Sequence, residues 1–270
     1  MTNLQTKKEL SKEYKHIKYI LTSTMRTKLI LTLYAYPKNL EELRSNLQKP
    51  SATILHGLKE LESMNLIKKV QKQYQLTSNG VILATNMVKL IENWVSLNNN
   101  SNFWNNHYLD DIPEEFLKNM HLLKDVKYIK STTSDLSNAF NKYIQLISDS
   151  QELKIIMPIY SENHLNHIIE LLNENKLRYV EMIISNEILN SIKLNKTFRN
   201  LLLKNKKVKI ICIKQNLKLF LTCSHDFMSL TLFFKDGHYD DSQILIGESE
   251  NAKKWGTNMF KYYEEMIEIE

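Results

Sequence analysis

The densest cluster of side chains that could do chemistry lies in the last third of the chain and comprises His225-Asp226, Lys235-Asp236 and Tyr239-Asp240-Asp241. A histidine beside carboxylates could carry out acid–base catalysis, because each group exchanges a proton in an accessible pH range. These residues, however, stand at expected strand ends and turns, where aspartate and glycine are common for structural reasons. We therefore assign no catalytic residue. We expect a small-molecule effector to bind this cluster, through His225, Asp226, Lys235, Tyr239 and Trp255, although a tryptophan could equally belong to the core.

A second group of candidate residues lies in the first third of the chain, on an expected helix that follows the turn at residues 49–51. At 100° per residue, Ile54, Leu58 and Leu61 fall on one face of this helix and should enter a core. The opposite face and the helix start carry groups suited to base edges, thymine methyl groups and phosphates. These candidate DNA-binding residues are Ser51, Ala52, Thr53, Leu55, His56 and Lys59. A solvated helix face is the alternative interpretation.

A basic hairpin is expected directly after this helix. Asn65 stands where the helix should end in a left-handed conformation, which glycine and asparagine adopt most readily. Three further candidate DNA-binding residues lie on or beside the hairpin: Lys68, Lys69 and Lys72. A solvated hairpin tip would have a similar composition. Nevertheless, the order of a short helix (residues 40–47), a turn, a second helix and a basic hairpin is that of a winged helix-turn-helix, which lays its second helix in the major groove of DNA.

The distribution of charge favours the same half of the chain. Residues 1–97 carry 15 lysines and arginines against 7 acidic residues, whereas residues 98–270 carry 21 against 23. The positive field therefore belongs to the segment with the DNA-binding pattern, as attraction to phosphate requires. The net charge of +6 is weaker evidence by itself, because only four of the 36 basic residues are arginine. Such lysine enrichment could come from an AT-rich genome.

Two apolar stripes border the expected DNA-binding segment. The first repeats at helical spacing in Leu10, Tyr14, Ile17 and Leu21, and the second repeats every seven residues in Leu83, Met87, Leu90, Trp94 and Leu97. A domain of this size cannot easily cover both stripes. We therefore expect a homodimer on an inverted-repeat operator, with packing against the second domain of the same chain as the alternative.

The remaining two thirds predict a different architecture. Short apolar runs alternate with helical segments from residue 126 to residue 213, which is typical of βαβ units with parallel strands. Further strands follow with no helix between them, and a final helix ends the chain. The expected fold is thus a two-domain α+β and α/β protein. It comprises a winged helix-turn-helix, mostly α with a β-wing (residues 1–97), a linker (98–106) and an α/β regulatory domain with a mixed sheet (107–270).

Several other classes of protein are disfavoured by composition. The two cysteines, Cys212 and Cys223, lie in apolar runs and form no metal-binding or redox motif, so we expect two buried reduced thiols and neither a metal nor a cofactor. No apolar run approaches the ~20 residues needed to cross a bilayer, and the N-terminus lacks the apolar core of a signal peptide. We therefore expect a cytoplasmic protein with no membrane partner.

The first domain resembles the winged helices of ArsR-like prokaryotic repressors. The residues that carry this resemblance are Thr53-Ile54, Leu58-Lys59-Glu60-Leu61, Leu66-Ile67 and Tyr74-Gln75-Leu76-Thr77-Ser78-Asn79-Gly80. Members that sense metals use clusters of cysteine or histidine, which the sequence lacks. The resemblance therefore argues against a metal sensor.

Nearly the whole chain is similar to the archaeal methanogenesis-regulator (FilR-type) family of winged-helix transcription factors. The matching segments in the second domain are Phe103-Trp104 with His107, Ile112–Leu117, Asp226–Asp240, Ala252–Gly256 and Phe260–Tyr263. This resemblance implies a regulatory second domain that senses a signal and adjusts DNA binding. It implies no particular effector.

The leading hypothesis is a ligand-responsive, dimeric transcription regulator that binds double-stranded DNA. An enzyme with an appended winged helix is the first alternative, and a winged helix used for protein–protein contact is the second. One hydrolytic route can be excluded, because the His-x-Lys-x4-Asp motif of phospholipase-D-like enzymes is absent. Its only partial match begins at His16 and has Ser23 in the place of the aspartate.

Overall fold

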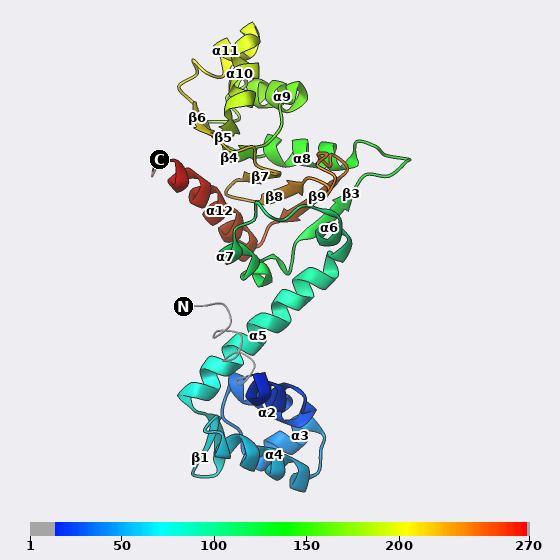
Figure 1. The fold of residues 1–270 in the computed structure, drawn as a ribbon, viewed down its shortest axis with the longest axis vertical. Helices are drawn as coiled ribbons and strands as arrows, with labels where there is room; N and C mark the ends of the chain where they lie inside the picture. Colours follow the sequence, from blue (N-terminus) through cyan, green and yellow to red (C-terminus); the bar gives the residue numbers. More distant parts are fainter. Residues whose placement is uncertain (1–13, 269–270) are drawn as a thin grey trace. The chain divides into compact units, whose positions relative to one another are not determined.

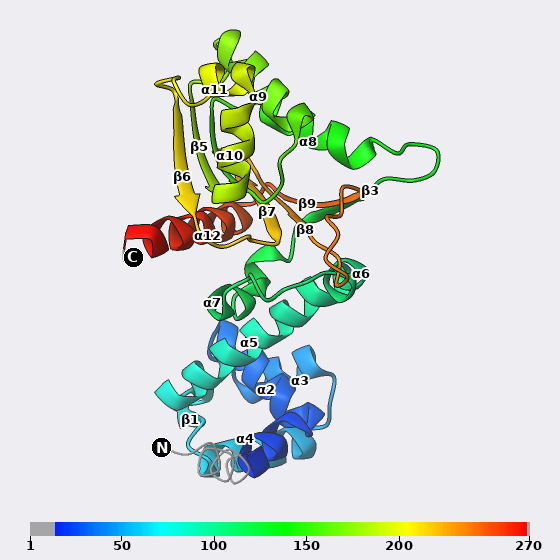
Figure 2. The ribbon, with the colours of Figure 1, turned by 45° about the horizontal axis from the view of Figure 1, so that its top comes forward.

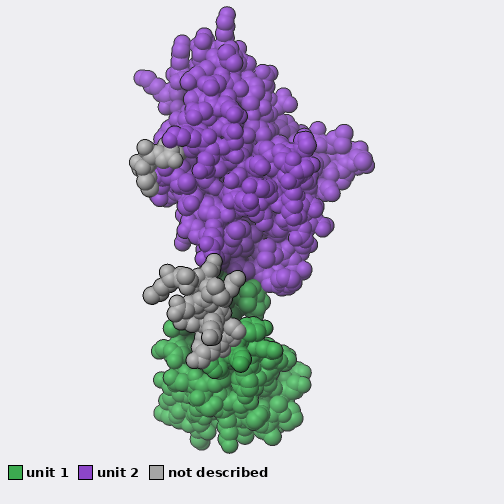
Figure 3. Space-filling view, in the orientation of Figure 1, with its two compact units in different colours: residues 1–91 green, residues 92–270 purple. Residues whose placement is uncertain are grey.

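The computed structural model describes residues 14–268, and Figure 1 and Figure 2 trace its ribbon from two directions. The chain divides into two compact units, residues 1–91 and residues 92–270, which Figure 3 colours separately. The boundary falls within helix α5 (Ser78–Asn99). Each unit has a core of its own. No helix among residues 14–268 is long and apolar enough to span a membrane.

The first unit contains the elements of a winged helix in the expected order. Residues 14–21 are helical and precede the rest. The elements that follow are α2 (Thr24–Ala35), α3 (Leu40–Leu47), α4 (Ser51–Ser63), β1 (Ile67–Val70) and β2 (Gln73–Leu76), and α5 begins immediately afterwards. The two strands pair antiparallel with Val70 opposite Gln73, so a two-residue turn joins them. The predicted helix, turn, helix and hairpin are all present.

Local sequence explains where these helices begin and end. The side chain of Asn39 accepts a hydrogen bond from the backbone N–H of Glu42, whose own side chain accepts one from the N–H of Asn39. This capping box satisfies two donors that the first turn of α3 would otherwise leave unpaired. Gln48 then ends α3 with φ 50°, and Asn65 follows α4 with φ 56°, which confirms the predicted left-handed position.

The corner between the wing and α5 requires glycine. Thr77 donates from its backbone N–H to the carbonyl of Leu66 and accepts a hydrogen bond at Oγ1 from the N–H of Gly80. A Cβ at position 80 would lie 1.9 Å from the carbonyl oxygen of Leu66, which is a backbone atom that cannot rotate away. Thr77 and Gly80 together therefore fix the start of α5 against the hairpin.

The second unit is built on a seven-stranded mixed sheet with the order β3-β9-β8-β7-β4-β5-β6. Strands β4, β5 and β6 are parallel, and every other neighbouring pair is antiparallel. The strands are β3 (Lys127–Lys130), β4 (Glu152–Met157), β5 (Tyr179–Ser185), β6 (Val208–Ile213), β7 (Leu219–Cys223), β8 (Met228–Leu232) and β9 (Gln243–Gly247). The mixed sheet was predicted from the change in pattern along the chain.

Helices cover both faces of this sheet (Figure 2). One layer packs on a core that includes Ile155, Met182 and Ile246, and consists of α8 (Asn138–Ser148), α9 (Glu162–Asn173), α10 (Asn186–Leu194) and α11 (Lys196–Leu201). The other layer packs on Ile156 and Ile183, and consists of α6 (Ser101–Asn106), α7 (Glu114–Leu117), the 3-10 helix η1 (Met120–Leu123) and α12 (Glu250–Glu268). Successive side chains of a strand alternate between the two cores because the strand repeat is two residues.

Two sequence-based expectations for this unit need correction. Residues 98–106, expected to be a linker, are helical, because they continue α5 and then form α6, which buries Phe103 and Trp104 in the core. The first expected strand, β3, forms no βαβ unit beside β4, since it pairs with β9 at the far edge of the sheet. The helical segment between β5 and β6 is divided into α10 and α11, because Asn195 caps α11 with its side chain.

Candidate nucleic-acid interface and effector pocket

Helix α4 sorts its side chains as its angular pattern predicts. Ile54, Leu58 and Leu61 are buried in the core of the first unit. Among the candidate DNA-binding residues of the helix, Ala52, Thr53, His56 and Lys59 are exposed, while Ser51 and Leu55 are half-buried. The helix therefore presents a mixed polar and small-apolar surface to solvent. Its contact with DNA stays a prediction.

Close packing and an ion pair hold α4 in place. Gly57 faces α2, and a Cβ there would lie 2.9 Å from Leu29 Cδ1, so the absence of a side chain lets the two helices approach. Arg26 of α2 lies 2.8 Å from a carboxylate oxygen of Glu60 and stacks over the ring of Tyr19. Hydrogen bonds from Tyr19 and then Arg26 lower the pKa of Glu60, which therefore stays ionised at neutral pH. The exposed face of α4 is thus fixed by contacts on its other side.

The wing presents its lysines to solvent. Lys68 and Lys69 on β1 and Lys72 in the turn are all exposed. Gln71, the other turn residue, has φ 56°. Lys38 pairs through its backbone with Tyr74 of β2, with N–H to O distances of 3.0 and 2.8 Å, so the segment before α3 supports the hairpin. The three lysines are therefore carried by a hairpin tied to the rest of the unit.

The five predicted ligand-binding residues do not converge. His225 and Asp226 are exposed neighbours that line a separate hollow of about 790 Å³, open solvent included, with His225 Nδ1 3.0 Å from Asp226 Oδ1. Lys235 is exposed on the loop after β8. Trp255 is buried, and its Nε1–H donates to the carbonyl of Phe116, so it is a core residue. Tyr239 alone among the five lines the pocket described next. These residues are near one another in the sequence, but β7, β8 and β9 run antiparallel. The loops that join them therefore lie at opposite ends of the sheet, and residues in successive loops are far apart.

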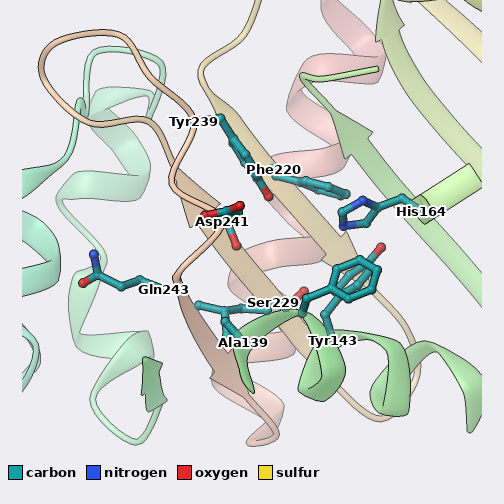
Figure 4. A pocket seen from close by; sticks show the side chains of 11 residues that line it. Ala139, Tyr143, His164, Phe220, Ser229, Tyr239, Asp241 and Gln243 are labelled. Carbon is teal, nitrogen blue, oxygen red and sulfur yellow. The ribbon is translucent and has the colours of Figure 1, made fainter. Parts of the chain in front are cut away.

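A pocket lies between α8, α9 and the strands β7 to β9 (Figure 4). It contains about 360 Å³ of space free of atoms, its mouth included. Figure 4 shows Tyr239, Phe220 and His164 along one side, Tyr143 beside His164, and Ala139 and Ser229 opposite. The remaining lining residues are Phe140, Thr231, Asp241, Gln243 and Ile244. Sequence reasoning placed Tyr239 and Asp241 in the candidate polar cluster and missed the other lining residues, which come from segments far apart in the chain.

Burial keeps the ionisable groups inside the pocket neutral. It lowers the pKa of His164 to about 4, and the Nδ1 atom of this histidine lies 2.8 Å from Ser161 Oγ. Burial also raises the pKa of Tyr143 and of Tyr239 well above the usual range. At neutral pH these three groups therefore carry no charge. Asp241, at the exposed rim, is the one acidic residue among the described lining residues.

A buried ion pair lies directly beside the pocket. His107 Nε2 is 2.9 Å from Asp240 Oδ2, and His107 Nδ1 is 2.5 Å from the carbonyl oxygen of Phe103. The ring therefore lies between two oxygen acceptors, one from a side chain and one from the backbone. Burial acts to raise the pKa of Asp240, but hydrogen bonds from His107 and Ser242 outweigh it and hold the pKa below the usual range. Sequence reasoning noted His107 only through the family resemblance.

Cysteines and other residue types that can bind metals give no further candidate site among residues 14–268. Cys223 is buried, which raises the pKa of its thiol to about 12, and Cys212 is half-buried. Both thiols are free, although only one is fully buried as expected. Within residues 14–268 no three His, Cys, Asp or Glu side chains gather to hold a metal ion.

Two family models match this chain in succession. The N-terminal domain of the methanogenesis regulatory protein FilR1 matches residues 14–94, and the middle domain of the same protein matches residues 136–266. The FilR1 protein of Methanothrix harundinacea (strain 6Ac) is 25% identical over 256 residues. That alignment covers 92% of this chain and 56% of the relative, so the chain spans little more than half of the relative's length.

Solved structures show only distant likeness. The archaeal chromatin protein TrmBL2, described as having a novel mode of DNA binding, is 14% identical with a TM-score of 0.41, over 88% of this chain and 90% of that one. A riboflavin-derivative dimethyltransferase, RosA from Streptomyces davawensis, is 9% identical with a TM-score of 0.27, over 79% of this chain and 67% of that one. Scores this low support no conclusion about function.

Replacing Asp240 by asparagine should destabilise the second unit by about 3–5 kcal/mol, because the buried His107 would lose the carboxylate that lies 2.9 Å from its Nε2. The pKa of Asp240 is lowered in the folded state, so its contribution is present above about pH 4 and is lost as the pH falls further. Thermal unfolding at pH 7 and at pH 3 should therefore show a large difference between wild type and variant that narrows in acid. Asp241→Asn, at the exposed neighbouring position, is the matched control, and equal losses for both variants would contradict this role of the pair.

Proposed function

Because the chain belongs to the family of the methanogenesis regulatory protein FilR1, we propose that it is a DNA-binding transcriptional regulator. The observation that carries this proposal is the exposed face of α4, which lies in sequence and in space beside the lysine-bearing wing of the same unit. In a winged helix-turn-helix this face enters the major groove while the wing contacts the backbone. A regulator of this kind works in the cytoplasm, where the DNA is.

The residues of α4 and the wing divide the task of recognition. His56 and Lys59 can hydrogen-bond base edges, Ala52 and Leu55 can contact thymine methyl groups, and Ser51 and Thr53 can bond the phosphate backbone near the helix start. Lys68, Lys69 and Lys72 supply charge at exposed positions that can reach phosphates. The helix would thus provide sequence preference and the wing would provide salt-dependent affinity.

A homodimer is the proposed functional form. The predicted stripe on α5 is divided, because Leu83 and Met87 pack into the core of the first unit while Leu90, Trp94 and Leu97 are 61%, 66% and 37% exposed. Of the stripe on the first helix, Tyr14, Ile17 and Leu21 are exposed, and Leu10 lies outside the described residues. Pairing these surfaces between two copies would bury them and create the twofold axis that an inverted-repeat operator needs.

An effector in the second unit would adjust this binding. The pocket between α8, α9 and the strands β7 to β9 supports such a role, because it combines an aromatic wall with hydroxyl, amide and carboxylate groups. An effector that prefers one placement of the two winged helices would shift the population towards it. The two-domain division into a DNA-binding and an effector-sensing part is proposed on the same basis.

The function is tested by a gel-shift titration with the DNA upstream of the protein's own gene, at physiological salt. Wild-type protein should prefer this DNA over random DNA, whereas His56→Ala should lose about 1–3 kcal/mol of binding to the specific site and little on random DNA. Equal affinity of the wild type for both DNAs would reject the proposal. Equal losses of the variant on both would reject the role of His56.

The wing lysines should act on all DNA alike. Lys69→Ala and Lys72→Ala should each weaken specific and random binding in parallel and flatten the slope of log affinity against log salt by about 0.9. Fluorescence anisotropy over a salt series measures both effects. Lys204→Ala, an exposed lysine of the second unit, is the control and should leave the slope unchanged. A slope that stays constant in the wing variants would show that they contact no phosphate.

The dimer should depend on the exposed end of the α5 stripe. Trp94→Glu should raise the dissociation constant of the dimer by at least about thirtyfold, because buried tryptophans at interfaces are worth about 2 kcal/mol or more. Sedimentation velocity over a concentration series measures this shift. Asn98→Glu adds the same charge at an exposed position of the same helix and should have a small effect. A variant Trp94→Glu that still sediments as the wild-type dimer would place the interface elsewhere.

A further inference from the structure

We propose that the pocket between α8, α9 and β7 to β9 takes a small flat molecule that is neutral or carries one positive charge, and that the Asp240–His107 pair transmits its binding to helix α6. This inference rests on the proposed function and specifies both the chemistry of the effector and the route by which its presence is communicated.

The shape of the pocket favours a flat ligand. Its aromatic rings form a connected wall, in which His164 lies 5.2 Å from both Tyr143 and Phe220 between ring centroids. Tyr239 extends the wall at 6.2 Å from Phe220. The pocket is small, with about 360 Å³ of atom-free space, its mouth included. A planar ring can lie along such a wall and direct one small polar group inward, whereas a bulky or branched molecule cannot.

The charges around the pocket exclude anions. Its lining contains one carboxylate, Asp241, and no lysine or arginine among the residues that the structure describes. His164 is neutral at physiological pH, so it supplies no positive charge to an anionic ligand. Phosphorylated or carboxylated molecules would therefore face a negative rim and would lose their hydration without compensation. An amino or amidinium group on a flat ring would instead pair with Asp241.

The route of transmission is a set of direct contacts within the second unit. Tyr239 and Asp241, which line the pocket, flank Asp240 in the chain, and Gln243 of the pocket wall donates its side-chain N–H to the Asp240 carboxylate. Asp240 binds His107, the residue that immediately follows α6. A ligand that moves any of these three pocket residues thus acts on groups joined directly to the ion pair.

Backbone pairing strengthens this route. Phe233 pairs with Tyr239, and the adjacent Phe234 pairs with His107, in two antiparallel bridges. The N–H of Tyr108 also donates to the carbonyl of Phe233, at 2.8 Å. The segment that ends α6 is therefore held to the same loop that closes the pocket. Since α6 follows α5 after a single residue, a change at His107 reaches the helix that continues into the first unit.

The ligand class is tested with three probes that share one ring and differ in charge: benzamidine, benzamide and benzoate. Isothermal titration or saturation-transfer NMR on the full chain, without DNA, should show benzamidine binding at least about tenfold more tightly than benzoate, with benzamide between them. Asp241→Asn should weaken benzamidine about threefold to fivefold and leave benzamide unchanged. Asp236→Asn, an exposed carboxylate of the same loop outside the pocket, is the matched control and should change neither.

Location and transmission need two further measurements. Ala139→Leu should fill the pocket and abolish binding of benzamidine. A thermal melt tests whether this variant is folded. If it is unfolded, the effect of Asp241→Asn on benzamidine affinity decides whether the ligand binds in this pocket. Hydrogen exchange of residues 100–108 should change on saturation with benzamidine. Benzoate binding as tightly as benzamidine, or binding that survives in both Asp241→Asn and folded Ala139→Leu, would overturn the ligand class and the site. Unchanged exchange at 100–108 in the benzamidine complex would overturn the route.

The outcome is separable from that of the proposed function. Probe binding and hydrogen exchange are measured without DNA, so a failure of the gel shift leaves them standing. Conversely, a protein that prefers its upstream DNA but binds none of the three probes remains a regulator and loses this effector pocket.

Discussion

The central strands of the second unit are apolar on both faces, and the sheet is therefore stable only where helices cover it on both sides. All residues of β7, β8 and β9 are buried, as are six of the seven in β5. Helices α8 to α11 cover one face, and α6, α7 and α12 cover the other. This requirement explains why residues 101–106 are a buried helix: Phe103 and Trp104 supply part of the second cover.

Burying a polar group in a core of this kind costs free energy unless the group is hydrogen-bonded. Asp240 and His107 satisfy one another and accept or donate further hydrogen bonds to neighbouring groups, so their burial is compensated. Their position beside the pocket is what gives the pair a possible regulatory use in addition to its structural one. The same loop that closes the pocket carries the carboxylate that holds the end of α6, so pocket and helix share one set of contacts.

The first unit solves a different problem, which is to expose a defined surface on a small domain. Core contacts of Ile54 and Leu58, the close approach at Gly57 and the ion pair of Glu60 with Arg26 all act on the inner side of α4. They leave the outer side free to contact a partner without a change of backbone. The wing differs, because its lysines are long and solvated and suit a contact that depends on charge more than on position.

The sequence by itself determined the local elements and their faces: the inward side of α4, the left-handed Asn65, the hairpin and the change from parallel to antiparallel strands follow from periodicity and from single-residue preferences. Periodicity and single-residue preferences act over a few neighbouring residues, so the sequence alone is enough to recognise them. Only the tertiary structure decided the strand order, the divided stripe on α5, the buried place of Trp255 and the pocket with its neighbouring ion pair. His107 and Asp240 are 133 positions apart, and no local pattern reports which distant segments a two-sided core will bring together.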